Sequence, residues 1–429
     1  MKDIINTNKF MFYIYLITLL IVVLLSIKIK PFGNPDEGAH FLRAYEISKG
    51  HFFNTKGNIG VNISCREYEI IAKKYAPIAF EQQFNKKDIF DEDCYVNSIN
   101  SAGVYSPFSY ILISTGFILS DFMNLGVENK LIFSRLFNGI ISITIIFFLT
   151  YKINYYKSIF IFITITPMFL VTISSISADS FLFIIIFIVL FLIIRNIEHN
   201  SNKSKHFYIF FLFSFFLLGT TKIVYSVISL LLLITFGNDK TKRYYSVVLI
   251  SIIVSFLSSI FFISISDSNL IYLGNSAIPI EQSRYVLNNF ISYIMIVFNS
   301  VFNYNVLRNL FFPNYLFGEN YFLFIFYPII YIILALSEDV SIFNTLKRLY
   351  TVFICFLIIF LISTSLYLYY NPVGYKMILG LQARYFIPVL IISSFVLPLS
   401  KNLFYVSDLI KKSLIIITLF TNIYFVVNL

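Results

Sequence analysis

The chain of 429 residues is 58% hydrophobic and only 13% charged, and runs of Phe, Ile and Leu recur from end to end. This composition is typical of a polytopic membrane protein and excludes a soluble domain of ordinary size. The net charge of +10 is divided among short Lys and Arg clusters between the apolar runs and is not gathered along one stripe. The charge therefore excludes a nucleic-acid-binding surface and indicates membrane topology.

The first apolar run extends from Phe10 to Ile29 and is preceded by Lys2 and Lys9. A signal peptide would end in a small-x-small cleavage site, which residues 26–31 do not offer, so we expect a retained first span. The polar segment that follows, from Lys30 to about Tyr105, is too long for a simple connector and is a candidate functional element.

Two of the three cysteines, Cys65 and Cys94, fall in this polar segment. They form a disulfide if the segment faces an oxidising compartment and are unpaired thiols otherwise, and the sequence leaves both alternatives open. Cys355 lies in an apolar run and is expected to be inert packing.

Twelve further apolar runs follow, which with the first makes thirteen candidates for membrane spans. They lie near residues 107–120, 131–150, 159–176, 181–194, 207–218, 223–236, 247–265, 290–301, 321–336, 352–370, 386–399 and 414–427. The loops after the third, fifth and seventh candidates (counting the first run) hold eight Lys and Arg, against two in the intervening short loops, so we place these basic loops inside. The amino end, with its two lysines, is then also inside.

Parity completes the predicted topology of eleven spans, with the amino end inside and the carboxyl end outside. The runs 107–120 and 290–301 become outer-surface or re-entrant helices, and the short runs 207–218 and 223–236 become a hairpin with Lys222 at its tip. We therefore expect an all-α integral membrane protein with a single transmembrane domain over residues 1–429. Residues 30–130 form a large first outer loop that carries surface helices, and residues 266–320 form a second long outer loop.

The stretch from Gly33 to Tyr45 begins where the first apolar run ends, so it places charged side chains at a membrane surface. It has the pattern of a helix start. Asn34 is placed to cap the helix, Pro35 suits the first helical position, and Glu37 stands three residues after the cap. Lys49-Gly50 marks the predicted end of this helix.

In such a helix Asp36, His40 and Arg43 share one face. The alternative is structural: the two acidic residues, Asp36 and Glu37, complement the positive end of the helix dipole, and Arg43 pairs with Glu46 or Glu37. The position after the first span, with the imidazole and the guanidinium on the same side, favours a functional site.

Nucleotide chemistry is not expected, because the chain has no Gly-rich phosphate loop, no His-Glu-x-x-His and no Cys-x-x-Cys. An activated substrate must then arrive by another route, and a lipid carrier in the bilayer is the obvious one. We expect no cofactor, and no metal-ligand cluster is visible beyond Asp36, Glu37 and His40.

Three motifs resemble those of known membrane proteins. Residues 34–45, followed by Ile47-Ser48-Lys49-Gly50, resemble the Pro-Asp-Glu-x-x-His-x-x-Arg-Ala signature of a large family of uncharacterised bacterial polytopic proteins often encoded with polysaccharide genes. Residues 382–388 are similar to the Gln-Gly-Arg-Tyr-Phe-x-Pro opening of a late span in that family, with Ala383 in place of the usual Gly. Residues 105–110 are similar to a Pro-Pro-x-x-Tyr motif of the wider superfamily of GT-C-fold glycosyltransferases, which includes protein O-mannosyltransferases and lipid A aminoarabinose transferases.

The resemblance implies a GT-C-like architecture and the transfer of a sugar from a polyprenyl-phosphate carrier to a lipid-linked or cell-surface glycan, such as an O-antigen. It implies a multi-pass protein of the bacterial cytoplasmic (inner) membrane with its active site on the outer face and an acidic residue of the first loop at the catalytic centre. The expected partners are the lipid-linked sugar donor, the glycan acceptor and membrane lipid, without nucleic acid.

Such a transfer needs a carboxylate near the acceptor proton and cations near the phosphate that leaves. Asp36 is the candidate base, with Glu37 as the other catalytic candidate. The expected substrate-binding residues are His40, Arg43, Tyr105, Asp179, Lys222, Arg384 and Tyr385.

Besides Arg43, three of these residues also keep a structural alternative. Arg384 is a phosphate ligand or an interfacial anchor beside Tyr385, and Lys222 is a second cation or a snorkelling loop tip. Asp179 is a second acidic group of the site or the N-cap of the following helix.

Two other functions remain as rivals. A polymerase or ligase for lipid-linked oligosaccharides would concentrate essential Arg residues in its mid-chain and late outer loops and would not need the Asp36/Glu37 pair. A flippase or transporter would be marked by broken helices and paired repeats.

Overall fold

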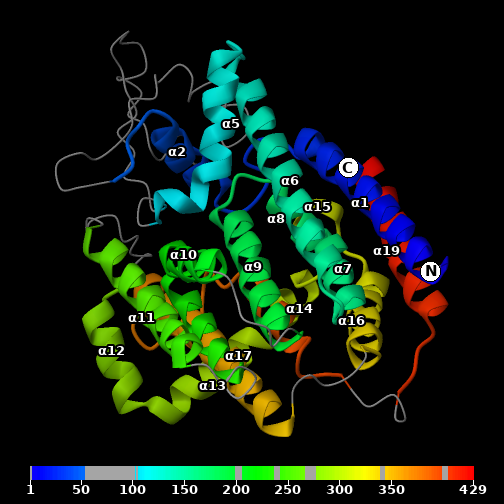
Figure 1. The fold of residues 1–429 in the computed structure, drawn as a ribbon. Helices are drawn as coiled ribbons and strands as arrows, with labels where there is room; N and C mark the ends of the chain where they lie inside the picture. The colour runs from blue at the N-terminus through cyan, green and yellow to red at the C-terminus, as the bar shows by residue number, and fades with distance from the viewer. Residues whose placement is uncertain are drawn as a thin grey trace.

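The computed structural model describes residues 2–53, 102, 105–198, 205–235, 242–265, 277–338, 344–398 and 404–429. Among these residues the protein is helical with no strand, as the sequence predicted (Figure 1). Cys65 and Cys94 lie outside the described residues.

Six helices of the described chain are long and apolar enough to cross a membrane, which supports a multi-pass membrane protein. They are α1 (Lys2–Lys28), α6 (Val127–Lys152), α9 (Ala178–Glu198), α11 (Lys242–Ile265), α17 (Thr345–Tyr370) and α19 (Asp408–Val427). Asn344 caps α17 and Ser407 caps α19 through their side-chain oxygens, which explains where these two helices begin. The predicted count of eleven spans stays a prediction.

Shorter helices account for the other apolar runs. They are η3 (Pro107–Tyr110) with α5 (Ile111–Phe122), α10 (Lys205–Thr221), η4 (Ile223–Thr235), α13 (Phe290–Val301), α16 (Tyr321–Leu336), and η6 (Ala383–Phe386) with α18 (Ile387–Ser393). Between and before these lie α2 (Glu37–Ser48), α12 (Pro279–Asn288), α14 (Tyr304–Asn309) and α15 (Asn314–Phe317). Lys222 joins α10 to η4 and so lies between the two short runs that the sequence predicted to form a hairpin, which stays a prediction. Because a 3₁₀-helix rises about 2.0 Å per residue, the 13 residues of η4 extend roughly 26 Å, farther than an α-helix of that length.

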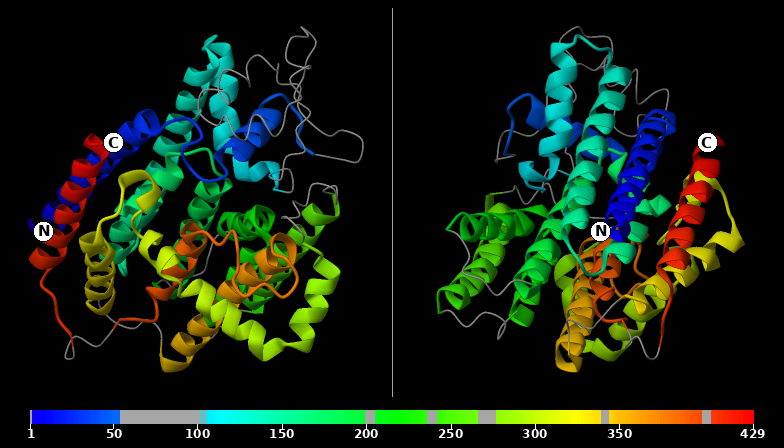
Figure 2. Two further views of the ribbon diagram at one scale, coloured as in Figure 1. Left: turned by 180° about the vertical axis from the view of Figure 1, so that it is seen from behind. Right: turned by 45° about the vertical axis from the view of Figure 1, so that its right-hand side comes forward.

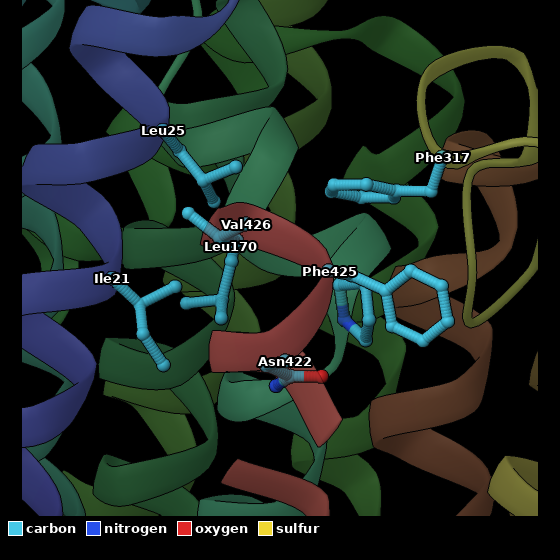
Figure 3. A pocket seen from close by; sticks show the side chains of 8 residues that line it. Ile21, Leu25, Leu170, Phe317, Asn422, Phe425 and Val426 are labelled. Carbon is cyan, nitrogen blue, oxygen red and sulfur yellow. The ribbon is translucent and has the colours of Figure 1, made fainter. Parts of the chain in front are cut away.

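The run 159–176 is broken into α7 (Lys157–Ile165) and α8 (Pro167–Ile173), which corrects the prediction of one continuous span. Pro167 has no N–H to donate, so the helix cannot pass through it unchanged. Neighbouring segments satisfy the freed groups: the side chain of Asn422 donates to the Ile165 carbonyl, and the Met168 N–H donates to the Phe311 carbonyl. Figure 3 shows Asn422 beside a small apolar pocket between α1, α8 and α19.

Helices α1 and α19 lie side by side along one edge of the molecule (Figures 1 and 2). They run in the same direction, because Lys28 at the end of α1 donates to the carbonyl of Val427 at the end of α19, with Nζ 2.6 Å from the oxygen. The two ends of the described chain therefore lie toward opposite faces of the bundle.

Helix α9 lies in the middle of the molecule, with α6 on one side and α10 on the other (Figure 1). In its most apolar stretch 78% of the residues are buried, a larger share than in any other candidate span of the described chain. Helix α2 follows α1 and packs on α5 and η3, where Phe41 and Tyr45 both meet the ring of Phe117. The first turn of α9 and the start of α2 thus lie close together, which brings their acidic residues into one region.

Candidate functional site

The local structure around Asp36 differs from the predicted helix start. Helix α2 begins at Glu37 and its N-cap residue is Asp36, so Pro35 lies before the helix. Asn34 does not cap it; its side-chain oxygen accepts a hydrogen bond from the Tyr315 hydroxyl at 3.3 Å. The predicted capping box is therefore wrong, whereas the predicted end at Lys49-Gly50 is confirmed, with Lys49 as the C-cap and Gly50 at φ +90°.

The backbone that presents Asp36 has two residues in the left-handed region, Phe32 at φ 57° and Asp36 at φ 63°. Asp tolerates this conformation better than most residues, but bulky side chains such as Phe rarely adopt it. Gly33 lies between them in a tight turn, where a Cβ would stand 2.9 Å from the Lys30 carbonyl oxygen. Strained backbone of this kind is typical of functional sites, where the surrounding structure holds it in place.

Asp36 contacts η6, the 3₁₀ turn that precedes α18, although the two lie at opposite ends of the sequence. Its Oδ2 accepts hydrogen bonds from Arg384 Nη2 at 2.9 Å and from Gln382 Nε2 at 2.7 Å. Arg384 also donates through Nη1 to the Pro35 carbonyl at 3.0 Å. The Asp36 side chain is 49% exposed and the Arg384 side chain only 6%, so a buried cation faces a carboxylate that solvent can reach.

A second carboxylate joins two cations. Asp179 Oδ1 lies 2.5 Å from Lys222 Nζ, and its Oδ2 lies 3.2 Å from Arg384 Nε. Ser177 caps α9 by accepting from the Asp179 N–H, so Asp179 stands in the first turn of the helix and is not its N-cap. With its side chain 1% exposed, Asp179 holds Lys222 and Arg384 beside each other. We call Asp36, Asp179, Lys222 and Arg384 the charged cluster.

Aromatic side chains surround the lysine of the charged cluster. Lys222 Nζ lies 5.3 Å from the ring centroid of Tyr105 and 4.7 Å from that of Tyr385. The Tyr225 hydroxyl donates to the Tyr385 carbonyl at 2.8 Å, which ties η4 to η6. These cation–π contacts and the ion pair with Asp179 show that Lys222 is not a snorkelling loop tip.

His40 lies behind this group as a neutral hydrogen-bonding side chain. Its Nδ1 is 2.6 Å from the Tyr110 hydroxyl, and its ring stacks on Tyr105 with centroids 5.8 Å apart. Burial, together with the charges of Arg384 and Lys222, lowers the pKa of His40 to about 3. Burial and the nearby carboxylates raise the pKa of Tyr105, so its hydroxyl stays protonated and can donate a hydrogen bond.

Glu37 is enclosed in a buried ion pair with Arg135 of α6. Arg135 donates to both carboxylate oxygens, through Nε at 2.8 Å and Nη2 at 2.6 Å, and the Ile176 N–H donates to Oε1 at 3.0 Å. Both side chains are fully buried. Glu37 therefore joins α2, α6 and the segment before α9, and its carboxylate faces no exposed surface.

Arg43 forms the structural ion pair that was the alternative to a role in the site. It pairs with Glu46 at 2.9 Å, with both side chains 1% exposed, and donates to the Phe52 carbonyl at 2.8 Å. Arg43 is thus directed to the end of α2, and His40 and Arg43 have different partners although they share the helix.

Helix amino ends meet at the charged cluster. Asp36 and Glu37 lie at the start of α2, Asp179 in the first turn of α9, and Arg384 just before α18. The positive ends of these helix dipoles favour negative charge, although the N–H groups of Glu37, Asp179 and Tyr385 are already hydrogen-bonded within the protein. The region therefore suits anionic groups such as carboxylates and phosphates.

The model of a protein family described as predicted membrane protein (DUF2142) matches residues 19–393 of the chain. The chain belongs to the DUF2142 family. All four members of the charged cluster lie within the range that the family model matches. No curated protein and no solved structure matches the chain.

In this DUF2142 protein, most of the site residues expected from the sequence come together. Asp36, Asp179, Lys222 and Arg384 form the charged cluster, and His40, Tyr105 and Tyr385 lie around it. Glu37 and Arg43 instead hold α2 in place. Among the described residues no group of three potential metal ligands is found.

Two residues with direct contacts here were not expected from the sequence. Gln382 binds Asp36, and its place in the motif with Arg384 was the available signal. Arg135 binds Glu37, and the signal was an arginine inside the apolar run 131–150, where a charge is expensive without a partner.

Proposed function

We propose that this protein is a membrane glycosyltransferase that moves a sugar from a polyprenyl-phosphate carrier to a cell-surface glycan on the outer face of the bacterial cytoplasmic membrane. The observation that carries this proposal is the contact between Asp36 and Arg384, with Oδ2 and Nη2 2.9 Å apart. A half-exposed carboxylate and a buried guanidinium are there within reach of one reacting bond. Their neighbour Lys222, which Asp179 holds beside Arg384, supplies the second cation that a phosphate group needs in this proposal.

In the proposed reaction the acceptor hydroxyl attacks the anomeric carbon of the sugar and gives its proton to Asp36. The bond between the anomeric carbon and the phosphate oxygen breaks, and its electron pair leaves with the lipid phosphate. Arg384 and Lys222 stabilise the charge that develops on this phosphate. Asp179 keeps the two cations at the required positions because it contacts both of them.

Neutral groups around the charged cluster suit the hydroxyls of a sugar. Tyr105 is protonated and Tyr385 flanks Lys222, so both tyrosines can contact a polar ligand. His40 is neutral and adds no charge beside the phosphate. Glu37 and Arg43 take no part in the chemistry in this proposal, because each is closed in its own buried ion pair.

A lipid-linked glycan flippase is the second candidate, because the break between α7 and α8 at Pro167 is a feature of many transporters. In transporters such breaks expose backbone groups to a substrate cavity. Here Asn422 and Phe311 bind the freed groups, so the break is packed within the protein. This packing favours the transferase.

The test is Asp36→Asn, expressed in cells whose own copy of the chain is deleted. Loss of the base is expected to lower sugar transfer to the surface glycan at least about 100-fold. The measurement is the composition of the surface glycan, followed by transfer from a radiolabelled polyprenyl-phosphate sugar in isolated membranes. Asn keeps the size of the side chain and also tolerates the left-handed backbone.

Asp121→Asn is the matched control, since Asp121 is a partly exposed carboxylate paired with Lys49 and Lys130 outside the site. It should leave transfer close to that of the unchanged protein. Transfer that persists in Asp36→Asn would show that the enzyme proposal is wrong. Transfer that is intact together with impaired movement of the lipid carrier across the membrane would support the flippase.

A further inference from the structure

The two cations of the charged cluster are already neutralised by two carboxylates. Lys222 pairs with Asp179, and Arg384 lies between Asp179 and Asp36. A phosphate that binds to Arg384 and Lys222 adds negative charge to a balanced and largely buried group. Since such charge is costly without a partner, one of the two carboxylates must give way to the phosphate.

The two carboxylates differ in how firmly they are held. Asp179 is 1% exposed, belongs to the first turn of the central helix α9, and contacts both cations. Asp36 is 49% exposed and precedes α2 on left-handed backbone, and both of its hydrogen bonds end on one oxygen, Oδ2. Water can solvate Asp36 when it leaves Arg384, but it cannot reach Asp179. Asp36 is therefore the carboxylate that moves.

We propose that Asp36 competes with the substrate phosphate for Arg384, so that phosphate binding releases the Asp36 carboxylate toward the acceptor. The contested group is the Arg384 guanidinium, whose Nη2 donates to Asp36 while Nη1 donates to the Pro35 carbonyl. Its Nε lies 3.2 Å from Asp179 Oδ2 but makes no hydrogen bond, so it is a further donor for the phosphate. This inference rests on the proposed function and adds an order to it. The phosphate-bearing donor binds first, and the base becomes available for the acceptor hydroxyl only afterwards.

The proposed competition predicts a gain in phosphate affinity when Asp36 is neutralised. A catalytic base that did not compete with the phosphate would not give this gain. Asp36→Asn should bind phosphate more tightly than the unchanged protein, although it should not transfer sugar. Removing a partly exposed ion pair of this kind changes an equilibrium by up to about 5-fold, which is the expected gain in affinity. Gln382→Leu removes one of the two donors that hold Asp36. It should therefore raise the affinity for phosphate where Asp36 is present and leave it unchanged in the Asp36→Asn background.

The experiment measures the affinity of the purified full-length protein in detergent by isothermal titration calorimetry at constant ionic strength. The probes are inorganic phosphate and farnesyl monophosphate, which separate a site for free phosphate from one that also requires a lipid. Asp121→Asn serves as the control for the loss of one negative charge outside the site. The double variant with Arg384→Gln tests whether the gain acts through the guanidinium, because the gain should then vanish.

Tighter binding of either probe to Asp36→Asn, lost in the double variant, supports the competition. Equal or weaker binding to Asp36→Asn overturns it and leaves the proposed transferase intact, because transfer is measured separately. A gain that Asp121→Asn reproduces also overturns it, since the effect is then one of net charge. Failure of every variant to bind either probe overturns both the competition and the proposed phosphate site.

Discussion

His40 illustrates how the site treats an ionisable side chain at the scale of one residue. It is 4% exposed, and Arg384 and Lys222 oppose its protonation while Asp36 and Asp179 favour it. Burial decides the balance, and the pKa of His40 falls to about 3. Burial also raises the pKa of Tyr110 well above its usual value. Both side chains are therefore neutral, and a hydrogen bond between two neutral groups joins them.

The lowered pKa predicts how the stability of the protein changes with pH. Between the usual pKa of 6.5 and about 3, the unfolded chain binds a proton that folded His40 does not. The contribution of neutral His40 to the free energy of unfolding is therefore fully present above pH 6.5. It is lost as the pH falls below that value, by about 1.4 kcal/mol for each pH unit. We expect His40→Gln to lose less thermal stability than the unchanged protein when the pH is lowered from 7 to 5.

The measurement is the melting temperature in detergent at pH 7, 6 and 5. His51→Gln is the control, because His51 is exposed and lies beyond the end of α2. Parallel melting curves for the unchanged protein and His40→Gln over this range would contradict the assignment of a low pKa to His40.

The charged residues of the site could be predicted from the sequence because charge near a membrane is costly without a use. Asp36 and Arg384 are 348 residues apart in the chain, yet both were expected at one site from the sequence, and the structure brings them into contact. Glu37 and Arg43 lie outside the charged cluster because each is bound in an ion pair, Glu37 with Arg135 and Arg43 with Glu46. Sequence spacing does not reveal a partner on another helix, such as Arg135. Which of two adjacent carboxylates is exposed therefore required the structure.

At the scale of the elements, the position of Lys222 at the end of α10 depends on how closely α10 approaches α11. Gly219 lies at the contact, where Ser259 Oγ donates to its carbonyl at 2.7 Å and Ser258 Oγ donates to the Phe216 carbonyl at 3.2 Å. A Cβ at residue 219 would overlap the Ser255 carbonyl oxygen. Small residues at such a crossing allow the two backbones to approach, as in membrane helix pairs generally.

Gly219→Ala is therefore expected to separate α10 from α11 and to destabilise the protein by about 1–3 kcal/mol, the usual cost of overpacking. Because Lys222 follows three residues later, the change should also weaken phosphate binding. Thermal unfolding in detergent and the affinity for inorganic phosphate measure the two effects. Gly126→Ala is the matched control, since a Cβ there meets nothing within 4 Å. Equal stability of the two variants would mean that the helices are not in close contact.

The elements themselves were predicted well where an apolar run is long and uninterrupted, as for α1, α6 and α17. Pro167 within the run 159–176 was the visible signal for the break between α7 and α8, but the apolar character of the run outweighed it. The 3₁₀ geometry of η4 had no comparable signal, because its composition suits an α-helix equally well. At the start of α2, tertiary contacts of Asn34 and Asp36 took precedence over the capping pattern.

At the scale of the whole molecule, the common direction of α1 and α19 bears on the topology. An odd number of crossings places the two chain ends on opposite sides of the membrane, and the predicted count of eleven is odd. The bond between Lys28 and the Val427 carbonyl joins the far ends of both helices at the face where α2 begins (Figure 2). If the basic amino end is inside, the charged cluster and the end of α19 are then on the outer side.

Single-cysteine labelling tests this arrangement in whole cells. The native thiols are first removed as Cys65→Ser, Cys94→Ser and Cys355→Ala, and one cysteine is then introduced as Lys9→Cys, Phe52→Cys or Leu429→Cys. We expect a membrane-impermeant maleimide to label Phe52→Cys and Leu429→Cys in intact cells, because both follow the outer end of a span, and to label Lys9→Cys only after permeabilisation. Labelling of Lys9→Cys and Leu429→Cys from the same side would contradict the parallel packing of α1 and α19. Labelling of Phe52→Cys only after permeabilisation would place the charged cluster inside, and the donor would then have to be a lipid carrier that presents its sugar to the cytoplasm.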